Sequence, residues 1–272
     1  MEPWGVFWLR VALALYSVGL WHSLLSVIRR KQQMFVAALT SISLGAVFHL
    51  VSLVFETIML GRAPVVSLYQ MASVSAFLIT VAFLVVYIRY RYESVAVFVF
   101  PIVFILTLVA SLSTPLEPWI QDSVGNWLLS AHVVMFLVGY AALFLTFIAG
   151  VMYLLQEREL KSHRPRAFYY RLPPLNKLDE VAYRTLAVGF LAVTTGIVMA
   201  SVWASVQWGA RWIVDPTIAL AFLTWAICLA MVFSRWAIGW RGRKGAYFAI
   251  VGFCCAALSW LVNSGVHSFM GP

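Results

Sequence analysis

The sequence predicts an all-α polytopic membrane protein, a single bundle of about eight transmembrane helices, on three observations. Of the 272 residues, 63% are hydrophobic and only 11% are charged, whereas soluble domains are roughly 45–50% apolar and about 25% charged. Eight apolar runs reach the roughly 20 residues that a helix needs to cross the hydrocarbon layer. Most basic residues lie in alternate connections between these runs. These observations exclude a soluble enzyme, a disordered chain and a conventional nucleic-acid-binding domain.

The predicted spans follow the apolar runs in order and form one integral membrane domain over residues 1–272. They are expected at 4–28, 34–58, 66–88, 94–113, 127–155, 185–207, 216–236 and 246–268. The run 185–207 is diluted by Thr and Ser but keeps the required length. All eight runs are too long for the strands of a membrane barrel, which need only about 9–11 residues each.

The first run is expected to be a retained span with its N-terminus outside. A signal peptide begins with a positively charged region, but residues 1–4 contain Glu2 and no Lys or Arg. The positive cluster at 29–31 follows the apolar run instead. This order of charge and apolar residues favours a span over a cleaved signal.

The basic residues predict the orientation of the bundle. Sixteen of the 19 Lys and Arg follow the first, third, fifth and seventh spans. The positive-inside rule places those connections in the cytoplasm, so both termini are expected outside a bacterial cytoplasmic (inner) membrane. The longest of these connections, 156–184, contains three prolines and many charges. We expect it to be a partly helical surface loop, with a solvated hinge between two helical groups as the leading interpretation.

Histidines inside the spans are the first candidates for chemistry, because ionisable groups in lipid are costly and tend to be functional. The five histidines are His22, His49, His132, His163 and His267. A helix-packing hydrogen bond explains His22, and His163 is expected to be solvated in the charged loop. His132 and His267 both lie near the external surface on different spans, where a neutral imidazole can bind iron or zinc. His49 lies deeper, with Glu56 on the same helical face. Taken alone, a histidine at a helix end is more often a capping or interfacial residue.

The connection before the seventh span is rich in tryptophan and lies on the same side as these two histidines. Its tryptophans are Trp203, Trp208 and Trp212. They could belong to the interfacial aromatic belt, but Asp215 and Pro216 form a helix-start signal that predicts a structured re-entry. Indole rings make an apolar platform for a flat ligand, and Arg211 could pair with a porphyrin propionate. These features suit a haem with two histidine ligands.

The sequence resembles the cytochrome c assembly family, the haem-handling membrane proteins of the CcsA, CcmC and HemX type. The resemblance covers most of the chain from the second span onward. The Trp-rich connection carries it most clearly. The other matching segments are His49 with Gly61-Arg62-Ala63-Pro64, Asn126–His132 with Gly139-Tyr140, Leu172–Leu175, Leu178–Arg184, Gly239–Lys244 and Gly265–Ser268.

The resemblance implies a site and a role. His132 and His267 would be the axial ligands of a transiently held haem b, beside the Trp-rich connection. The other cofactor-binding residues implied are Trp203, Trp208, Trp212, Arg211, Asp215, with a main role in capping the seventh span, and His49, the histidine buried in an early span. The partners expected are an apocytochrome c and another cytochrome-assembly membrane protein. Haem delivery or a chaperone role is expected rather than self-contained catalysis.

Four departures from the family pattern keep a second function open, one of them being Thr217-Ile218-Ala219 in place of a polar run. Val214 replaces a tryptophan, Gln70 replaces a common glutamate, and Phe233 stands where a second buried histidine occurs in members that carry haem through the membrane. The alternative is a HemX-like membrane regulator of tetrapyrrole synthesis, acting through its cytoplasmic loops on glutamyl-tRNA reductase. A small-molecule transporter is a third interpretation, but the paired helix breaks typical of that class are not visible.

Overall fold

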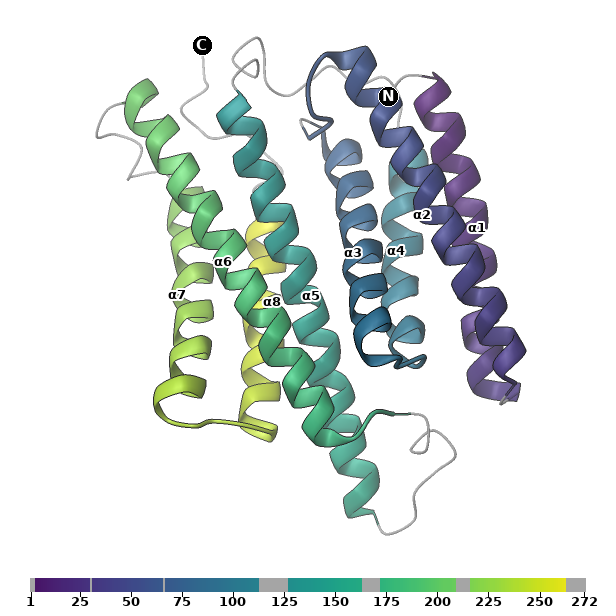
Figure 1. Cartoon of the computed structure of the whole chain (residues 1–272). Helices are drawn as coiled ribbons and strands as arrows, with labels where there is room; N and C mark the ends of the chain where they lie inside the picture. The colour runs from purple at the N-terminus through teal and green to yellow at the C-terminus, as the bar shows by residue number, and fades with distance from the viewer. Residues whose placement is uncertain are drawn as a thin grey trace. The chain divides into compact units, whose positions relative to one another are not determined.

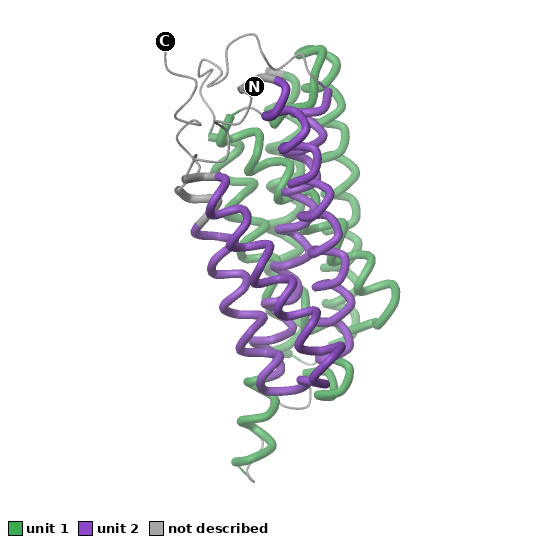
Figure 2. The backbone as a smooth tube through the Cα atoms, turned by 90° about the vertical axis from the view of Figure 1, so that its left-hand side faces the viewer, with its two compact units in different colours: residues 1–117, 154–178 green, residues 118–153, 179–272 purple. Residues whose placement is uncertain are grey.

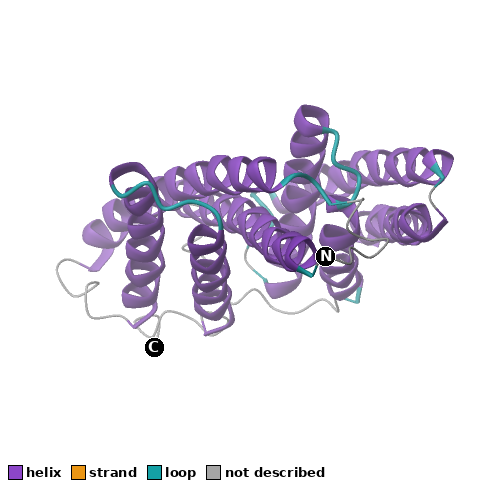
Figure 3. Cartoon of the chain, turned by 90° about the horizontal axis from the view of Figure 1, so that it is seen from below, coloured by secondary structure: helices purple, strands orange, loops and turns teal. Residues whose placement is uncertain are grey.

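The predicted helical architecture is confirmed. The computed structural model describes residues 3–29, 31–65, 67–112, 127–162, 172–208 and 216–262. Over these residues the chain forms eight α-helices and no strand (Figure 1 and Figure 3). Within them, six helices are long and apolar enough to cross a membrane, and α4 is a shorter apolar helix of 17 residues. The protein is therefore a multi-pass helical membrane protein.

The helix bounds follow the apolar runs closely in most of the chain. The helices are α1 (Pro3–Arg29), α2 (Gln32–Leu60), α3 (Leu68–Tyr90), α4 (Val95–Ser111), α5 (Trp127–Lys161), α6 (Leu175–Trp208), α7 (Pro216–Ala237) and α8 (Arg243–Val262). Five of them, α1 to α4 and α7, begin and end within two residues of the predicted spans. The start of α7 at Pro216 agrees with the helix-start signal.

Two helices continue well beyond their apolar runs. Helix α5 ends at Lys161 rather than at 155, and α6 begins at Leu175 rather than at 185. Ion pairs one helical turn apart support these charged ends, with Lys161 Nζ 2.6 Å from Glu157 Oε1 and Arg184 Nη2 2.9 Å from Glu180 Oε1. Such pairs stabilise helices slightly in water. The stretch 156–184 is thus partly helical, as expected.

Local signals fix the ends of the early helices. Helix α2 is followed by Gly61 in the left-handed region, at φ 64°, where glycine has no steric penalty. Helix α3 starts with a capping box. The backbone N–H of Gln70 donates to Ser67 Oγ at 3.2 Å, and the backbone N–H of Ser67 donates to the side-chain Oε1 of Gln70 at 3.3 Å. Two of the otherwise unsatisfied amides at this helix end are thereby bonded.

The chain divides into two compact units, which Figure 2 shows in different colours. Unit 1 comprises residues 1–117 and 154–178, and unit 2 comprises 118–153 and 179–272. Helices α1 to α4 belong to unit 1, and most of α5 and α6 together with α7 and α8 belong to unit 2. Two of the boundaries fall inside α5 and α6, at the ends where these helices carry their charged turns.

Unit 1 is held together by close packing of α1 on α2. Helix α1 also contacts α4, and α3 contacts both α4 and α2. Two glycines allow the close approach of α1 and α2, because a Cβ on Gly45 would lie 2.8 Å from the Tyr16 ring, and one on Gly19 would lie 2.6 Å from Ile42 Cγ1. Small residues serve this purpose widely in membrane helix pairs.

Unit 2 also has glycines at close helix contacts, at two helix pairs. A Cβ on Gly139 of α5 would lie 2.6 Å from Val193 Cγ2 of α6, and one on Gly150 would lie 3.0 Å from the Ala246 carbonyl of α8. A buried cluster fills the centre of the unit; its members are Leu143, Leu186, Val193, Cys228, Met231, Ala249 and Ala256. The α5–α6 pair therefore has little freedom to separate or slide.

Candidate haem-binding site

His132 lies near the start of α5 and forms a hydrogen bond to the backbone of α6. Its Nδ1 is 2.9 Å from the Gly196 carbonyl oxygen. A carbonyl can only accept, so Nδ1 carries the proton and the lone pair of the neutral ring resides on Nε2. Histidines that bind a metal usually donate their other ring N–H to a carbonyl or carboxylate in this way. The fixed tautomer therefore suits His132 for iron binding through Nε2.

Gly196 makes this hydrogen bond possible because it lets α6 approach α5. A Cβ on Gly196 would lie 2.6 Å from Phe136 Cδ2, closer than two carbon atoms can pack. The Phe136 ring contacts the His132 ring edge to face, with the centroids 4.9 Å apart. Any side chain at position 196 would displace Phe136 and, through it, the imidazole.

Two side-chain hydrogen bonds also join α6 to its neighbours α5 and α7. Thr146 Oγ1 of α5 is 2.8 Å from Thr185 Oγ1 of α6. Trp225 of α7 donates from Nε1 to Thr194 Oγ1 of α6 at 3.0 Å. Hydrogen bonds between spans resist separation because the alternative in lipid is an unsatisfied polar group. The backbone that carries the Gly196 carbonyl is thus fixed from two sides.

Trp203 is the one predicted pocket tryptophan whose side chain the structure describes. It is buried on α6, seven residues after Gly196 and so two helical turns further along the same face. Helix α6 ends at Trp208, and its indole lies outside the described side chains. Arg211, Trp212, Asp215 and His267 also lie outside the described residues, so their place in a pocket stays a prediction.

His49 is enclosed in unit 1 and contacts two other helices. Its Nδ1 lies 3.3 Å from Tyr16 Oη on α1, and its Nε2 lies 3.0 Å from Ser73 Oγ on α3. The side chain is fully buried, and Phe77 packs edge-on against it at 5.6 Å between ring centroids. Both ring nitrogens are therefore within hydrogen-bonding distance of protein hydroxyl groups.

Glu56 and Gln70 form a second buried polar pair in unit 1. Gln70 Nε2 donates to Glu56 Oε1 at 3.0 Å, joining α3 to α2, and Glu56 is fully buried. The prediction that His49 and Glu56 share one face of α2 is confirmed, since both side chains are buried in this unit. Gln70 thus has two roles, because the same side chain completes the capping box of α3.

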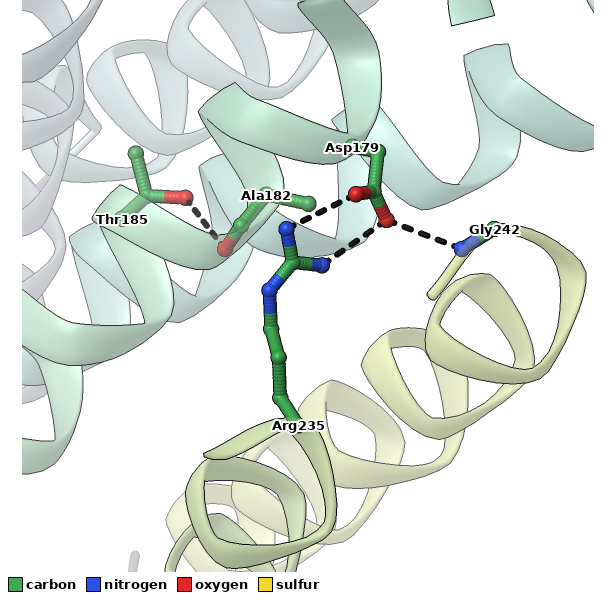
Figure 4. A network of polar contacts seen from close by, with 5 residues as sticks. All are labelled: Asp179, Ala182, Thr185, Arg235 and Gly242. Atoms are coloured by element: carbon green, nitrogen blue, oxygen red, sulfur yellow. Dashed lines mark hydrogen bonds and ion pairs between the residues drawn. The ribbon is translucent and has the colours of Figure 1, made fainter. Parts of the chain in front are cut away.

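A third polar site joins the segments 178–184 and 239–244, to which no role was assigned from the sequence. Figure 4 shows Asp179 of α6 between Arg235, near the end of α7, and Gly242, which precedes α8. Arg235 donates from Nη1 and Nη2 to the two carboxylate oxygens at 2.8 and 2.7 Å, and the Gly242 amide donates to Oδ1 at 3.0 Å. The Arg235 guanidinium also lies 4.5 Å from the centre of the Tyr183 ring. We call Asp179, Arg235 and Gly242 the carboxylate clamp.

Sequence reasoning found the histidines but not the residues that bind them. Gly196, Tyr16 and Ser73 are common residue types within apolar runs, and each is far from its partner in sequence. Arg235 had a usable signal, because a guanidinium at the end of an apolar run calls for a nearby carboxylate. The connection 156–184 contains four acidic residues that could supply it, and in the structure Asp179 does so.

Comparison with known proteins gives a consistent family. The family model described as cytochrome C assembly protein matches residues 8–268. A cytochrome c biogenesis protein CcsA from Prochlorococcus marinus (strain MIT 9515) is 29% identical over 278 residues, covering 91% of this chain and 87% of the relative. A protein of the same name from Chlamydomonas reinhardtii is 31% identical over 161 residues, covering 58% of this chain and 43% of the relative.

A solved structure shares the fold. The cytochrome c heme lyase CcmF superposes with a TM-score of 0.72 at 18% sequence identity. The superposition covers 95% of this chain and 46% of the CcmF chain, so the present chain spans about half the length of that protein. At this identity the similarity is one of fold.

Proposed function

Because this chain belongs to the cytochrome C assembly protein family, we propose that it handles haem during the assembly of c-type cytochromes. In this proposal the chain holds haem at the extracytoplasmic face of the bacterial cytoplasmic membrane and presents it to an apocytochrome. The family match covers residues 8–268, so the proposal applies to nearly the whole chain. The names of the matched relatives, cytochrome c biogenesis protein and cytochrome c heme lyase, support the same process.

The observation that carries the proposal is the hydrogen bond from His132 Nδ1 to the Gly196 carbonyl, at 2.9 Å. This bond selects the tautomer with its lone pair on Nε2 and holds the ring in one orientation. A ring oriented before the ligand arrives loses less freedom on binding. His132 is thus prepared to act as one axial ligand of the haem iron.

The remaining ligands of the proposed site are assigned from the sequence pattern. His267 would supply the second axial nitrogen, and Trp208 and Trp212 would cover the porphyrin face. Arg211 would pair with a propionate, while Asp215 would cap α7, which begins at the next residue. The buried indole of Trp203, two turns beyond Gly196 on the same face of α6, supports apolar surroundings on this side of the helix.

The chain's own contribution would be to bind, orient and protect the haem. Two imidazoles would occupy both axial positions of haem b, and the indoles would keep water from the ring faces. The haem supplies the vinyl groups that react with substrate thiols, so the protein needs no nucleophile of its own. Another cytochrome-assembly membrane protein is the proposed partner that brings the apocytochrome to this site.

The direct test is the absorption spectrum of the purified full-length chain from haem-replete cells. We expect a Soret band, and we expect His132→Ala and His267→Ala each to lower haem occupancy at least about tenfold, as loss of a supporting contact to a metal site already does. His22→Gln is the matched control, since His22 also lies in a span with Nδ1 2.9 Å from a backbone carbonyl, that of Val18.

Exogenous imidazole separates ligation from folding. It can occupy the space left by an imidazole side chain, so we expect it to restore the Soret band of His132→Ala. The absence of haem from the wild-type protein, or equal occupancy in His132→Ala and wild type, would refute the proposed site.

A second candidate function, regulation of glutamyl-tRNA reductase, is favoured by the helical charged ends of α5 and α6. The ion pairs of Lys161 with Glu157 and of Arg184 with Glu180 give these ends ordered surfaces that a partner could bind. Deleting 160–178 discriminates between the two functions. The deletion should spare haem occupancy if the chain handles haem, and it should abolish reductase binding if the chain is a regulator.

A further inference from the structure

We infer that this chain holds no haem among the helices of unit 1, and that His49 is instead the hydrogen-bonding centre that joins α1, α2 and α3. The family resemblance implies a haem ligand at this buried histidine, but the surroundings of His49 do not fit that role. If the chain binds haem as proposed above, the inference has the consequence that it holds one haem rather than two; this consequence rests on the proposed function.

The first reason is the use of both ring nitrogens. A neutral imidazole has one N–H and one lone pair, and here Tyr16 Oη lies 3.3 Å from Nδ1 while Ser73 Oγ lies 3.0 Å from Nε2. One hydroxyl therefore accepts from the ring, and the other donates to its lone pair. Iron needs that same lone pair, so it could bind only after one of these interhelical bonds is broken.

The second reason is space. The Tyr16 ring fills the gap over Gly45, where a Cβ would lie only 2.8 Å from it. Phe77 covers another side of the imidazole, with ring centroids 5.6 Å apart. The Tyr16, His49 and Ser73 side chains all have no exposed surface. A porphyrin beside His49 would have to displace side chains from a close-packed interior, where even the insertion of single methylene groups is destabilising.

The third reason is the missing second ligand. At the position where the resemblance implies another buried histidine, the chain has Phe233, whose ring has no lone pair for iron and is 54% exposed. Among the described residues of unit 1, the other histidine is His22, whose Nδ1 is 2.9 Å from the Val18 carbonyl of its own helix. The described contacts of the His49 ring are with Tyr16, Ser73 and Phe77 and include no second imidazole, so unit 1 shows no paired ligand for iron at this position.

The test counts haem and follows stability in the same full-length protein. Haem is loaded to saturation and quantified per chain as the pyridine haemochrome, for wild type, His49→Gln, His132→Gln and the control His22→Gln. We expect one haem in wild type and in His49→Gln, an unchanged Soret maximum in His49→Gln, and loss of at least about tenfold in His132→Gln. His49→Gln should also melt at a lower temperature, by about 2–4 °C for each hydrogen bond lost.

Tyr16→Phe and Ser73→Ala keep the imidazole but remove its partners, which covers the case in which His49→Gln does not fold. Both should lower the melting temperature and leave the haem count unchanged. Two haems in wild type, or a haem count halved in His49→Gln, would overturn the inference while leaving the external site standing. No haem in any variant would refute the proposed function and still agree with a haem-free unit 1.

Discussion

The carboxylate clamp offers the sharpest prediction about the stability of unit 2. Replacing Asp179 with Asn keeps the size of the side chain but removes the charge that Arg235 binds through two hydrogen bonds. The Arg235 guanidinium would then face a neutral amide while remaining packed on the Tyr183 ring. The substitution therefore isolates the electrostatic part of the contact.

The expected magnitude follows from the partial burial of the pair. The side chains of Arg235 and Asp179 are 18% and 15% exposed, which lies between the two regimes that have been measured. Breaking a fully buried pair costs about 3–5 kcal/mol, and an exposed pair contributes about 0–1 kcal/mol. With a bidentate geometry and a third bond from Gly242, we expect a loss of about 2–3 kcal/mol, or about 5–10 °C in melting temperature.

The assay is a double-mutant cycle measured by thermal unfolding in detergent. It compares Asp179→Asn, Arg235→Gln and the double variant with wild type, because the coupling between the two changes separates the pair from other effects. Glu180→Gln is the matched control. Glu180 pairs with Arg184 on an exposed helix surface, where the side chains are 29% and 58% exposed, so its loss should cost no more than about 0.5 kcal/mol.

The reasoning fails if Asp179→Asn melts within error of Glu180→Gln, or if the cycle gives a coupling near zero. Either result would mean that water screens the clamp as it screens a surface pair. A coupling above about 1 kcal/mol, together with a near-silent control, would support a clamp that fixes α6 against the ends of α7 and α8.

Three further substitutions test other features. Gly242→Ala should lower the melting temperature by several degrees, because position 242 has φ 68° and a Cβ there would lie 2.7 Å from Tyr153 Oη; unchanged melting would contradict this. Gly196→Ala should reduce haem occupancy more than it reduces stability, since it disturbs the bond to His132, and absorption per chain reports the outcome. Ser67→Ala should destabilise α3 by about 1 kcal/mol through loss of its cap, measured by thermal unfolding.

Apolar runs alone predicted most of the fold, and the bounds that they did not predict are the end of α5 and the start of α6. Hydropathy marks the part of a helix that lies in lipid, so it placed α1 to α4 and α7 within two residues. It does not detect helical turns that continue into water. The ends of α5 and α6 are stabilised by i,i+4 ion pairs such as that of Lys161 with Glu157; the charges of 156–184 predicted a partly helical surface loop, but hydropathy gave no bounds for its helical turns.

The candidate site was predictable by residue type but not by contact. His132 and His49 were identified because ionisable groups are rare in spans. Their partners could not be read from the sequence, because a backbone carbonyl at Gly196 has no side-chain signature and Tyr16 is one of 11 tyrosines. Such pairings depend on how neighbouring helices are rotated about their axes, which the apolar pattern leaves open.

Helix α6 carries both Asp179 of the carboxylate clamp and the Gly196 carbonyl that contacts His132. Asp179 and Gly196 lie 17 residues apart on this one helix, or about 25 Å along its axis. Pivoting α6 about the clamp by only about 2° would shift the Gly196 oxygen by roughly 1 Å. The 2.9 Å bond to His132 would then be lost. The hydrogen bonds of Thr185 and Thr194 to the neighbouring helices oppose such a pivot, so the imidazole keeps its contact because α6 is held at several points between the clamp and Gly196.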